Sequence, residues 1–371
     1  KKYLDKVKTL SLSPEAIQKE HDLKIVFTPL HGTTYELVPA SLRNWGFTNI
    51  HTVPEQSIPD GDFPTVASAN PEEPAAFKMA LDLARKIDAD LAMACDPDGD
   101  RIGIAVKNDA GEWTLLNGNQ TNIIFTEYII RRKKELNQLK GGEYTVKTIV
   151  TTELIKDIAE KNHIICYDVY TGFKWIADVI RKEGGEKFIG GGEESFGYMP
   201  GAFTRDKDGV SATSLMAEIA AWVKMQNKTL YSFLKEIYAK YGFSQERMIY
   251  IVRKGLSGAQ EIKAMMEEFR HNPPKEINHS PVVLKKDYLS LEATNLQTGE
   301  KTHLNFETKS DVLQFFLADG SKISVRPSGT EPKIKFYFEG RAQMKDMNDY
   351  ERAQQDANAR IDAIIKDLKL Q

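Results

Sequence analysis

The chain has 371 residues, enough for about two or three domains of ordinary size. Its formal net charge of -3 gives no electrostatic argument for a nucleic-acid or membrane-surface partner. No stretch reaches membrane-spanning length, and residues 1–8 lack the apolar core of a signal peptide and an initiator Met. Because the initiator Met is missing, we expect the chain to be part of a longer protein. Cys95 and Cys166 are too few for a disulfide framework, so we expect a reducing cytoplasm.

The first part of the chain alternates apolar stretches with helical patterns. After a charged helix and linker within residues 1–20, we expect strands over 23–28, 50–53 and 91–95, with helices near 35–45 and 77–84 between them. This alternation is the signature of a parallel sheet with covering helices.

The same alternation restarts after residue 117, and the pattern changes again after residue 245. The last part has apolar, strand-like stretches at 248–252, 282–284, 304–306, 312–317, 323–325 and 334–338, flanked by helices near 259–269 and 345–368. The expected fold class is therefore α/β. We expect two successive α/β domains with mixed or parallel sheets covered by helices, at 1–117 and 118–245, and a C-terminal α+β domain with an antiparallel sheet, at 246–371.

A turn rich in carboxylates joins two apolar runs, in the sequence Asp96-Pro97-Asp98-Gly99-Asp100-Arg101. Carboxylates at alternate positions repel one another, and a hard divalent cation such as Mg²⁺ or Ca²⁺ relieves that repulsion. An EF-hand is excluded, because the sixth and twelfth positions hold Arg101 and Lys107 in place of Gly and Glu. A simple polar turn is the alternative, but ligand sites in parallel sheets gather where this turn lies, at the carboxyl end of a strand.

A second loop combines glycine and charge, from Gly190 to Tyr198. The three consecutive glycines at its start allow the backbone to approach a ligand, and Glu193, Glu194 and Ser195 offer the acceptors and hydroxyl that bind sugar hydroxyls. Taken alone, the loop could equally be a flexible acidic surface loop.

A third loop, Arg326-Pro327-Ser328-Gly329-Thr330-Glu331-Pro332-Lys333, separates two expected strands. It places backbone N–H groups, two hydroxyls and two cations around one point, as a phosphate site requires. The alternative is an ordinary hairpin loop with cationic strand ends.

Isolated cations give weaker signals. Lys174 stands at an expected helix start, where a cation is unfavourable unless an anion binds there, and Arg205 and Lys207 lie in a charged loop. No two histidines have metal-ligand spacing, and His31 is interpreted as a turn residue. Neither a Gly-x-Ser-x-Gly elbow nor a Walker A motif occurs.

The three loops, in this order and spacing, resemble the α-D-phosphohexomutase superfamily of phosphoglucomutases and phosphomannomutases. Thr-Pro-Leu-His-Gly-Thr at 28 and Thr-Gly-Phe-Lys-Trp at 171 are most similar to the phosphoglucomutase and phosphopentomutase branch. Tyr198 stands where the phosphomannomutase-type loop often has His, which speaks against a mannose preference. The resemblance covers the second, third and fourth of four domains, so the family's nucleophilic serine, in a Ser-His-Asn-Pro type motif, is absent from this sequence.

The resemblance implies a phosphosugar mutase that interconverts hexose 1-phosphate and 6-phosphate through a sugar bisphosphate. It implies that Mg²⁺ is held by Asp96, Asp98 and Asp100, that Arg101 contacts the phosphoserine region, and that Lys207 lies near the reacting hydroxyl. Sugar hydroxyls would be bound by Glu193 and Ser195. The substrate phosphate would be held by Lys174, Arg326, Ser328, Gly329 and Thr330.

Several alternatives stay open. The substrate could be a pentose or mannose phosphate, and the chain could be a non-catalytic module that binds Mg²⁺ and phosphosugars. A phosphatase with an Asp nucleophile would require a different fold. We expect a monomer or homodimer, and no mutase turnover by this chain alone, because it lacks the serine.

Overall fold

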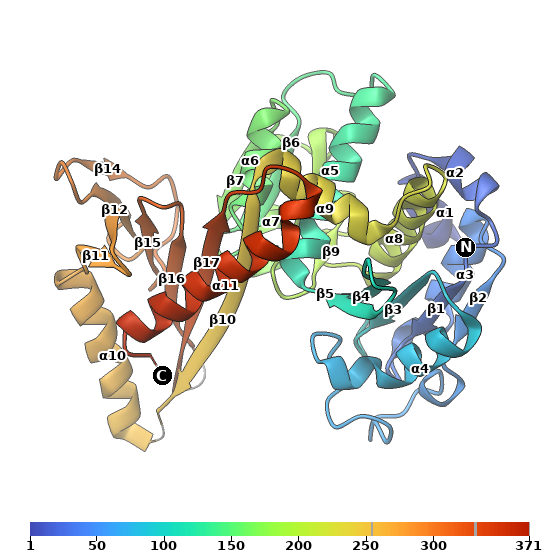
Figure 1. Ribbon diagram of the computed structural model, residues 1–371, viewed down its shortest axis with the longest axis horizontal. Helices are drawn as coiled ribbons and strands as arrows, with labels where there is room; N and C mark the ends of the chain where they lie inside the picture. The colour runs from blue at the N-terminus through green and yellow to red at the C-terminus, as the bar shows by residue number, and fades with distance from the viewer. Residues whose placement is uncertain (254, 330–331, 371) are drawn as a thin grey trace. The chain divides into compact units, whose positions relative to one another are not determined.

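The computed structural model describes residues 1–253, 255–329 and 332–370. It divides into two compact units, Lys1–Ile237 and Tyr238–Gln371 (Figure 1). None of the helices in these ranges combines the length and apolar character that a membrane crossing needs.

The first sheet has the order β2-β1-β3-β4-β5. Its strands are β1 (Ile25–Thr28), β2 (Ile50–Thr52), β3 (Leu91–Cys95), β4 (Ile102–Lys107) and β5 (Trp113–Leu116). Strand β1 runs parallel to β2 and β3, as the strand–helix alternation predicts, whereas β4 and β5 are antiparallel to their neighbours. The accompanying helices are α1 (Lys2–Lys8), α2 (Pro14–Lys19), α3 (Leu37–Trp45) and α4 (Lys78–Ile87). The small residues Ala80 and Ala84 bring α4 close to the sheet, where they share a core with Val26 and Ala92.

The second sheet has the order β7-β6-β8-β9 and also lies in the first unit. Its strands are β6 (Tyr144–Thr148), β7 (Ile165–Val169), β8 (Phe188–Gly192) and β9 (Tyr198–Met199), and β6 is parallel to both β7 and β8. The helices that follow the first sheet are α5 (Gly118–Glu135), α6 (Leu154–Lys161), α7 (Phe173–Glu183), α8 (Gly209–Lys224) and α9 (Leu230–Tyr241). Helix α5 starts at a capping box formed by Asn117 and Gln120, and Asp208 caps α8.

Short 3₁₀ segments complete the chain. They are η1 (Thr33–Tyr35), η2 (Pro54–Gln56), η3 (Pro74–Phe77), η4 (Gly185–Lys187) and η5 (Met347–Asp349).

A fully buried lysine on β6, Lys147, forms ion pairs with two carboxylates. The Nζ of Lys147 lies 2.8 Å from Asp168 Oδ1 and 3.0 Å from Glu153 Oε1, and it donates to the carbonyl of Thr148 at 3.3 Å. Burial alone would lower the pKa of Lys147, but Asp168 and Glu153 hold it well above its usual value.

Replacement of this lysine, Lys147→Met, is expected to lower the free energy of unfolding by about 2 kcal/mol, because it leaves two neighbouring carboxylates without their cation. The carboxylates are partly exposed, so water limits the loss. Urea denaturation measures it, with Lys156→Met as the control, because Lys156 forms an exposed pair with Glu160. Equal stability of the two variants would contradict the expectation.

Helix α8 holds the N-terminal segment through a buried carboxylate. Glu218 accepts hydrogen bonds from the Ser11 hydroxyl, from the backbone N–H of Leu12 at 2.8 Å and from the Tyr128 hydroxyl at 2.7 Å. Burial is the main cause that raises the pKa of Glu218.

A raised pKa means that the folded chain binds this proton more tightly than the unfolded chain does. Glu218 therefore adds stability below its unfolded pKa of 4.5, and this contribution is lost as the pH rises through the folded pKa. Glu218→Gln is expected to make the decline of unfolding free energy above about pH 4.5 shallower, since Gln has no proton to lose. Chemical denaturation across this pH range checks it, and a slope equal to that of the parent chain would contradict it.

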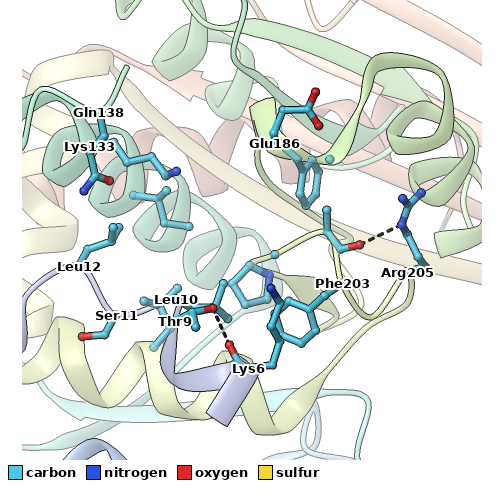
Figure 2. Close-up of a pocket in the computed structure, with 17 residues that line it drawn as sticks. Lys6, Thr9, Leu10, Ser11, Leu12, Lys133, Gln138, Glu186, Phe203 and Arg205 are labelled. Atoms are coloured by element: carbon cyan, nitrogen blue, oxygen red, sulfur yellow. Dashed lines mark hydrogen bonds between the residues drawn. The ribbon is translucent and has the colours of Figure 1, made fainter. Parts of the chain in front are cut away.

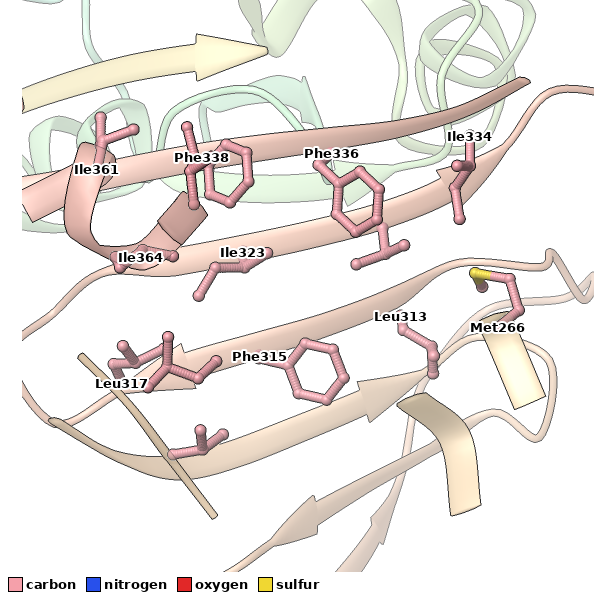
Figure 3. Close-up of a cluster of buried hydrophobic side chains, with 14 of the residues drawn as sticks. Met266, Leu313, Phe315, Leu317, Ile323, Ile334, Phe336, Phe338, Ile361 and Ile364 are labelled. Atoms are coloured by element: carbon pink, nitrogen blue, oxygen red, sulfur yellow. The ribbon is translucent and has the colours of Figure 1, made fainter. Parts of the chain in front are cut away.

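The second unit is built on one antiparallel sheet. Its main order is β10-β17-β16-β15-β12-β13-β14, with β11 paired to β12. The strands are β10 (Phe243–Val252), β11 (Glu276–Ile277), β12 (Ser280–Asp287), β13 (Glu292–Asn295), β14 (Lys301–His303), β15 (Leu313–Leu317), β16 (Lys322–Pro327) and β17 (Lys333–Ala342). Ile334, Phe336 and Phe338 alternate along β17 and share the core with α10 (Gly255–His271) and α11 (Tyr350–Asp367), as Figure 3 shows for Met266, Ile361 and Ile364.

One strand expectation in this unit is wrong. Residues 304–306 are not a strand, and the strands on either side of the preceding turn are β13 and β14. The three residues of β14 are all exposed, because this strand forms the end of the sheet. An edge strand needs no apolar alternation, so periodicity could not identify it.

Candidate functional site

The Asp turn, residues 96–101, folds around its own first carboxylate. It connects β3 to β4, and Asp96 Oδ1 accepts the backbone N–H groups of Asp100 at 3.1 Å and Arg101 at 2.9 Å. Gly99 has a φ of +78°, which favours glycine there. The sequence therefore sets the turn locally, and the turn gathers its carboxylates.

Asp96, Asp98 and Asp100 each offer an oxygen, and these oxygens lie within 4.8 Å of one another. Burial, with Asp100 and Asp98 nearby, raises the pKa of Asp96 to about 7. Asp100 Oδ1 is buried and has no hydrogen-bond partner in the described part of the chain. Three converging carboxylates with an oxygen left to satisfy fit a hard cation such as Mg²⁺.

Two cations stand against this cluster. Arg101 Nε lies 3.4 Å from Asp96 Oδ2, and its Nη1 lies 3.1 Å from Glu72 Oε1. The ammonium of Lys207 lies 2.6 Å from Asp100 Oδ2. Lys207 therefore occupies an oxygen that a metal ion could use.

Glycine contacts fix the Asp turn to two neighbouring segments. A Cβ at Gly32 would lie 2.2 Å from Pro97 Cα, and the N–H of Thr33 donates to the Pro97 carbonyl at 2.8 Å. The N–H of Gly209, at the start of α8, donates to the Gly99 carbonyl at 3.0 Å. The turn is thus held from both sides.

The Asp turn is also joined to the Glu loop, residues 192–198. Arg101 and Gly197 form an isolated antiparallel bridge, and the N–H of Ile102 donates to the Phe196 carbonyl at 2.9 Å. A Cβ at Gly197 would lie 2.4 Å from Lys207 Cδ, so the lysine stem crosses this glycine on its way to Asp100. Residues about one hundred positions apart therefore form one polar site.

Within the Glu loop, Glu193 is the oriented carboxylate. Its Oε1 accepts the backbone N–H of Gly172, and its Oε2 accepts the Ser195 hydroxyl at 3.3 Å. Burial, followed by the neighbouring charge of Glu194, raises the pKa of Glu193. Glu194 faces elsewhere, since its Oε2 accepts hydroxyls of Thr148 and Thr151 at 3.3 and 3.1 Å.

Lys174 is the second residue of α7, as the sequence predicts. Its side chain is exposed, and its ammonium lies 5.0 Å from the centre of the Trp175 ring. Gly172, which binds Glu193, lies two residues before it. The exposed ammonium of Lys174 therefore stands two residues after the backbone N–H that binds Glu193.

The expected phosphate loop lies in the second unit, between β16 and β17. Arg326 pairs in register with Lys335, and the N–H of Ser328 donates to the Lys333 carbonyl at 2.7 Å, which closes a hairpin. Gly329 is exposed, and Thr330 lies outside the described residues. A cavity of about 190 Å³ beside the loop is lined in part by Ser328 and Lys333.

Two features were beyond sequence reasoning. Glu72, the partner of Arg101, lies in a Pro-rich loop where no periodicity marks it. Tyr198 is 2% exposed and stacks on Phe125 with 4.3 Å between ring centres, so its ring is part of the core.

His31 behaves as expected for a turn residue, with its ring nitrogens 3.0 Å from the Ile58 carbonyl and 2.8 Å from Thr65 Oγ1.

Comparison with known proteins gives three consecutive matches to one family. Residues 1–111 match phosphoglucomutase/phosphomannomutase alpha/beta/alpha domain II, residues 117–241 match alpha/beta/alpha domain III, and residues 272–356 match the C-terminal domain.

Similar individual proteins are longer than this chain. A phosphoglucomutase of Staphylococcus aureus (strain N315) is 38% identical over 317 residues, which cover 85% of this chain and 56% of that protein. Parafusin of Paramecium, an exocytosis-sensitive phosphoprotein and phosphoglucomutase, has a similar structure in its open form, with a TM-score of 0.67, 17% identity, and coverage of 100% of this chain and 60% of that one. A family protein from Burkholderia thailandensis has a TM-score of 0.59 and 16% identity, over 92% of this chain and 61% of that one. The chain thus spans a little over half the length of the curated relative.

Proposed function

Because the chain belongs to the phosphoglucomutase/phosphomannomutase family, we propose that it works within a longer phosphosugar mutase, which interconverts the 1-phosphate and 6-phosphate of glucose. The observation that carries the proposal is the direct bridge between the Asp turn and the Glu loop at Arg101 and Gly197. It puts a candidate metal site beside a candidate hydroxyl-binding site, as transfer of a phosphoryl group to a sugar hydroxyl requires.

The proposed metal ligands are Asp96, Asp98 and Asp100, and Mg²⁺ bound there would offset negative charge on a phosphoryl group. Arg101 and Lys207 add fixed positive charge around the same turn. They would stabilise the equatorial oxygens of the group in transfer.

The Glu loop would orient the sugar. Glu193 accepts a hydrogen bond from the Gly172 N–H, so its carboxylate is already oriented to accept hydrogen bonds from sugar hydroxyls. Ser195, hydrogen-bonded to Glu193, would contribute a second polar contact. Charge-assisted bonds of this kind set which sugar is accepted.

The substrate's own phosphate would be bound by Lys174 together with Arg326, Ser328, Gly329 and Thr330. Arg326 suits a tetrahedral dianion through its fork of N–H donors. We propose that the nucleophilic serine belongs to a domain outside this chain. Its phosphoserine would give its phosphoryl group to one sugar hydroxyl, and the reoriented bisphosphate would return the other phosphoryl group to the serine. We also propose that the protein is a monomer or homodimer and that it works in a reducing cytoplasm, in keeping with its free cysteines Cys95 and Cys166.

The test compares this chain with the longer protein proposed here. The longer protein, supplied with Mg²⁺, is expected to convert glucose 1-phosphate to glucose 6-phosphate faster than it uses ribose 1-phosphate or mannose 1-phosphate. This chain alone is expected to bind glucose 1-phosphate without turnover. Lack of activity on all three substrates by the longer protein would overturn the proposal, and a preference for ribose or mannose would redirect it.

A further inference from the structure

The first unit contains a recess that the proposed mutase chemistry does not use. It has a volume of about 590 Å³ and is lined by the N-terminal segment, α5, η4 and residues 200–205 (Figure 2). This volume is in the range of sites that hold small metabolites.

Positive charge surrounds the recess. Lys6, Lys133 and Arg205 line it, against a single carboxylate from Glu186. Figure 2 shows that they come from separate directions, with Lys133 on α5 opposite Arg205 and Glu186. Such an excess of cations around one concave site favours an anionic ligand.

The two lysines are uncommitted. In the described part of the chain, neither Lys6 nor Lys133 has an ion pair or a side-chain hydrogen bond. The preceding α5 residue, Arg132, is by contrast paired with Glu15 at 2.7 Å and Glu135 at 2.6 Å. Burial lowers the pKa of Lys133, and the nearby charge of Glu143 offsets this effect only in part, so the ammonium is partly desolvated.

Arg205 is held in place by backbone contacts. Its Nε donates to the Ala202 carbonyl at 2.9 Å, and it adopts a φ of +61°. In the described residues it has no carboxylate partner, so its remaining N–H donors are available.

Apolar side chains also line the recess, and we call this part of the lining the apolar floor. Leu10, Phe188 and Phe203 line it. A Cβ at Gly201 would lie 2.7 Å from Leu10 Cδ2, and one at Gly185 would lie 2.8 Å from Ala202 Cβ. A side chain at Gly185 or Gly201 would therefore collide with Ala202 or Leu10, so glycine at both positions allows this close packing beside the recess.

We propose that this recess binds a phosphate-bearing small molecule whose non-phosphate part is apolar or planar. The cations from Lys6, Lys133 and Arg205 would bind its phosphate groups, and the apolar floor would pack against the remainder. The site is separate from the proposed mutase centre, because its lining includes none of the Asp turn or the Glu loop.

Methyl NMR of this chain, with labelled Leu and Ile, tests the proposal. The probes are pyrophosphate, ADP and adenosine, and the reporters are the recess residues Leu10, Ile129 and Leu215. Pyrophosphate and ADP are expected to shift these signals in a saturable way, ADP more tightly, while adenosine binds more weakly than either. The three reporters line the recess in the first unit, whereas Arg326 belongs to the second unit.

The variants Lys133→Met and Lys6→Met are each expected to weaken pyrophosphate binding about tenfold, because each removes a charge-assisted contact. Lys134→Met is the matched control, since Lys134 is an exposed neighbour that does not line the recess. Absence of saturable shifts at millimolar probe, or equal affinity in Lys133→Met and Lys134→Met, would overturn the proposal. ADP binding no tighter than pyrophosphate would overturn the role of the apolar floor.

Discussion

Asp98→Asn is expected to weaken Mg²⁺ binding by this chain on the order of 100-fold. Asp98 is the most exposed of the three turn carboxylates. It also accepts none of the backbone hydrogen bonds that shape the turn, which go to Asp96. The change therefore removes one ligand charge and leaves the fold intact. Isothermal titration with Mg²⁺ measures the loss, and in the longer protein mutase turnover is expected to fall with it.

The matched variant is Lys207→Met, which is expected to act in the opposite direction on metal binding. The ammonium of Lys207 lies 2.6 Å from Asp100 Oδ2, so it competes with a cation for that oxygen. Its removal should strengthen Mg²⁺ binding several-fold in this chain, yet lower turnover in the longer protein. Mg²⁺ affinity unchanged by Asp98→Asn would contradict the assignment of the Asp turn as the metal site.

The Asp turn could be predicted from the sequence because its geometry is local. Three carboxylates within five residues, between two apolar runs, must lie close together, and Gly99 allows the turn that gathers them. The strand–helix alternation likewise predicts the parallel pairing of β1 with β2 and β3, since such connections need covering helices.

What the sequence could not provide is contact between distant segments. The bridge between Arg101 and Gly197 and the ion pair between Arg101 and Glu72 depend on how separate elements pack. Resemblance to a family suggested that these loops share a site, but periodicity along one segment carries no such information. Strand β13 and the edge strand β14 were missed for a related reason, because few of their residues enter the core.

Glu193→Gln is expected to lower kcat/KM of the longer protein for glucose 1-phosphate by about 100- to 1,000-fold. The carboxylate is positioned by the Gly172 N–H and the Ser195 hydroxyl, and only its ionised form accepts sugar hydroxyls with both oxygens. Charge-assisted hydrogen bonds contribute roughly 1.5–3 kcal/mol each, and two such bonds account for the loss. Steady-state kinetics with Mg²⁺ at saturation measures it.

The dependence of kcat/KM on pH distinguishes a Glu193 that binds the sugar from one that only supports the loop. Burial raises the pKa of Glu193, so the accepting form is lost on acidification at a pH above the usual 4.5 of a glutamate, and kcat/KM should fall there. The Gln variant should lack that contribution to the acid limb. Glu194→Gln is the matched control, because Glu194 accepts hydrogen bonds from Thr148 and Thr151, which Gln can still accept. Equal losses in the two variants would show that loop integrity, and not contact of Glu193 with the sugar, limits the reaction.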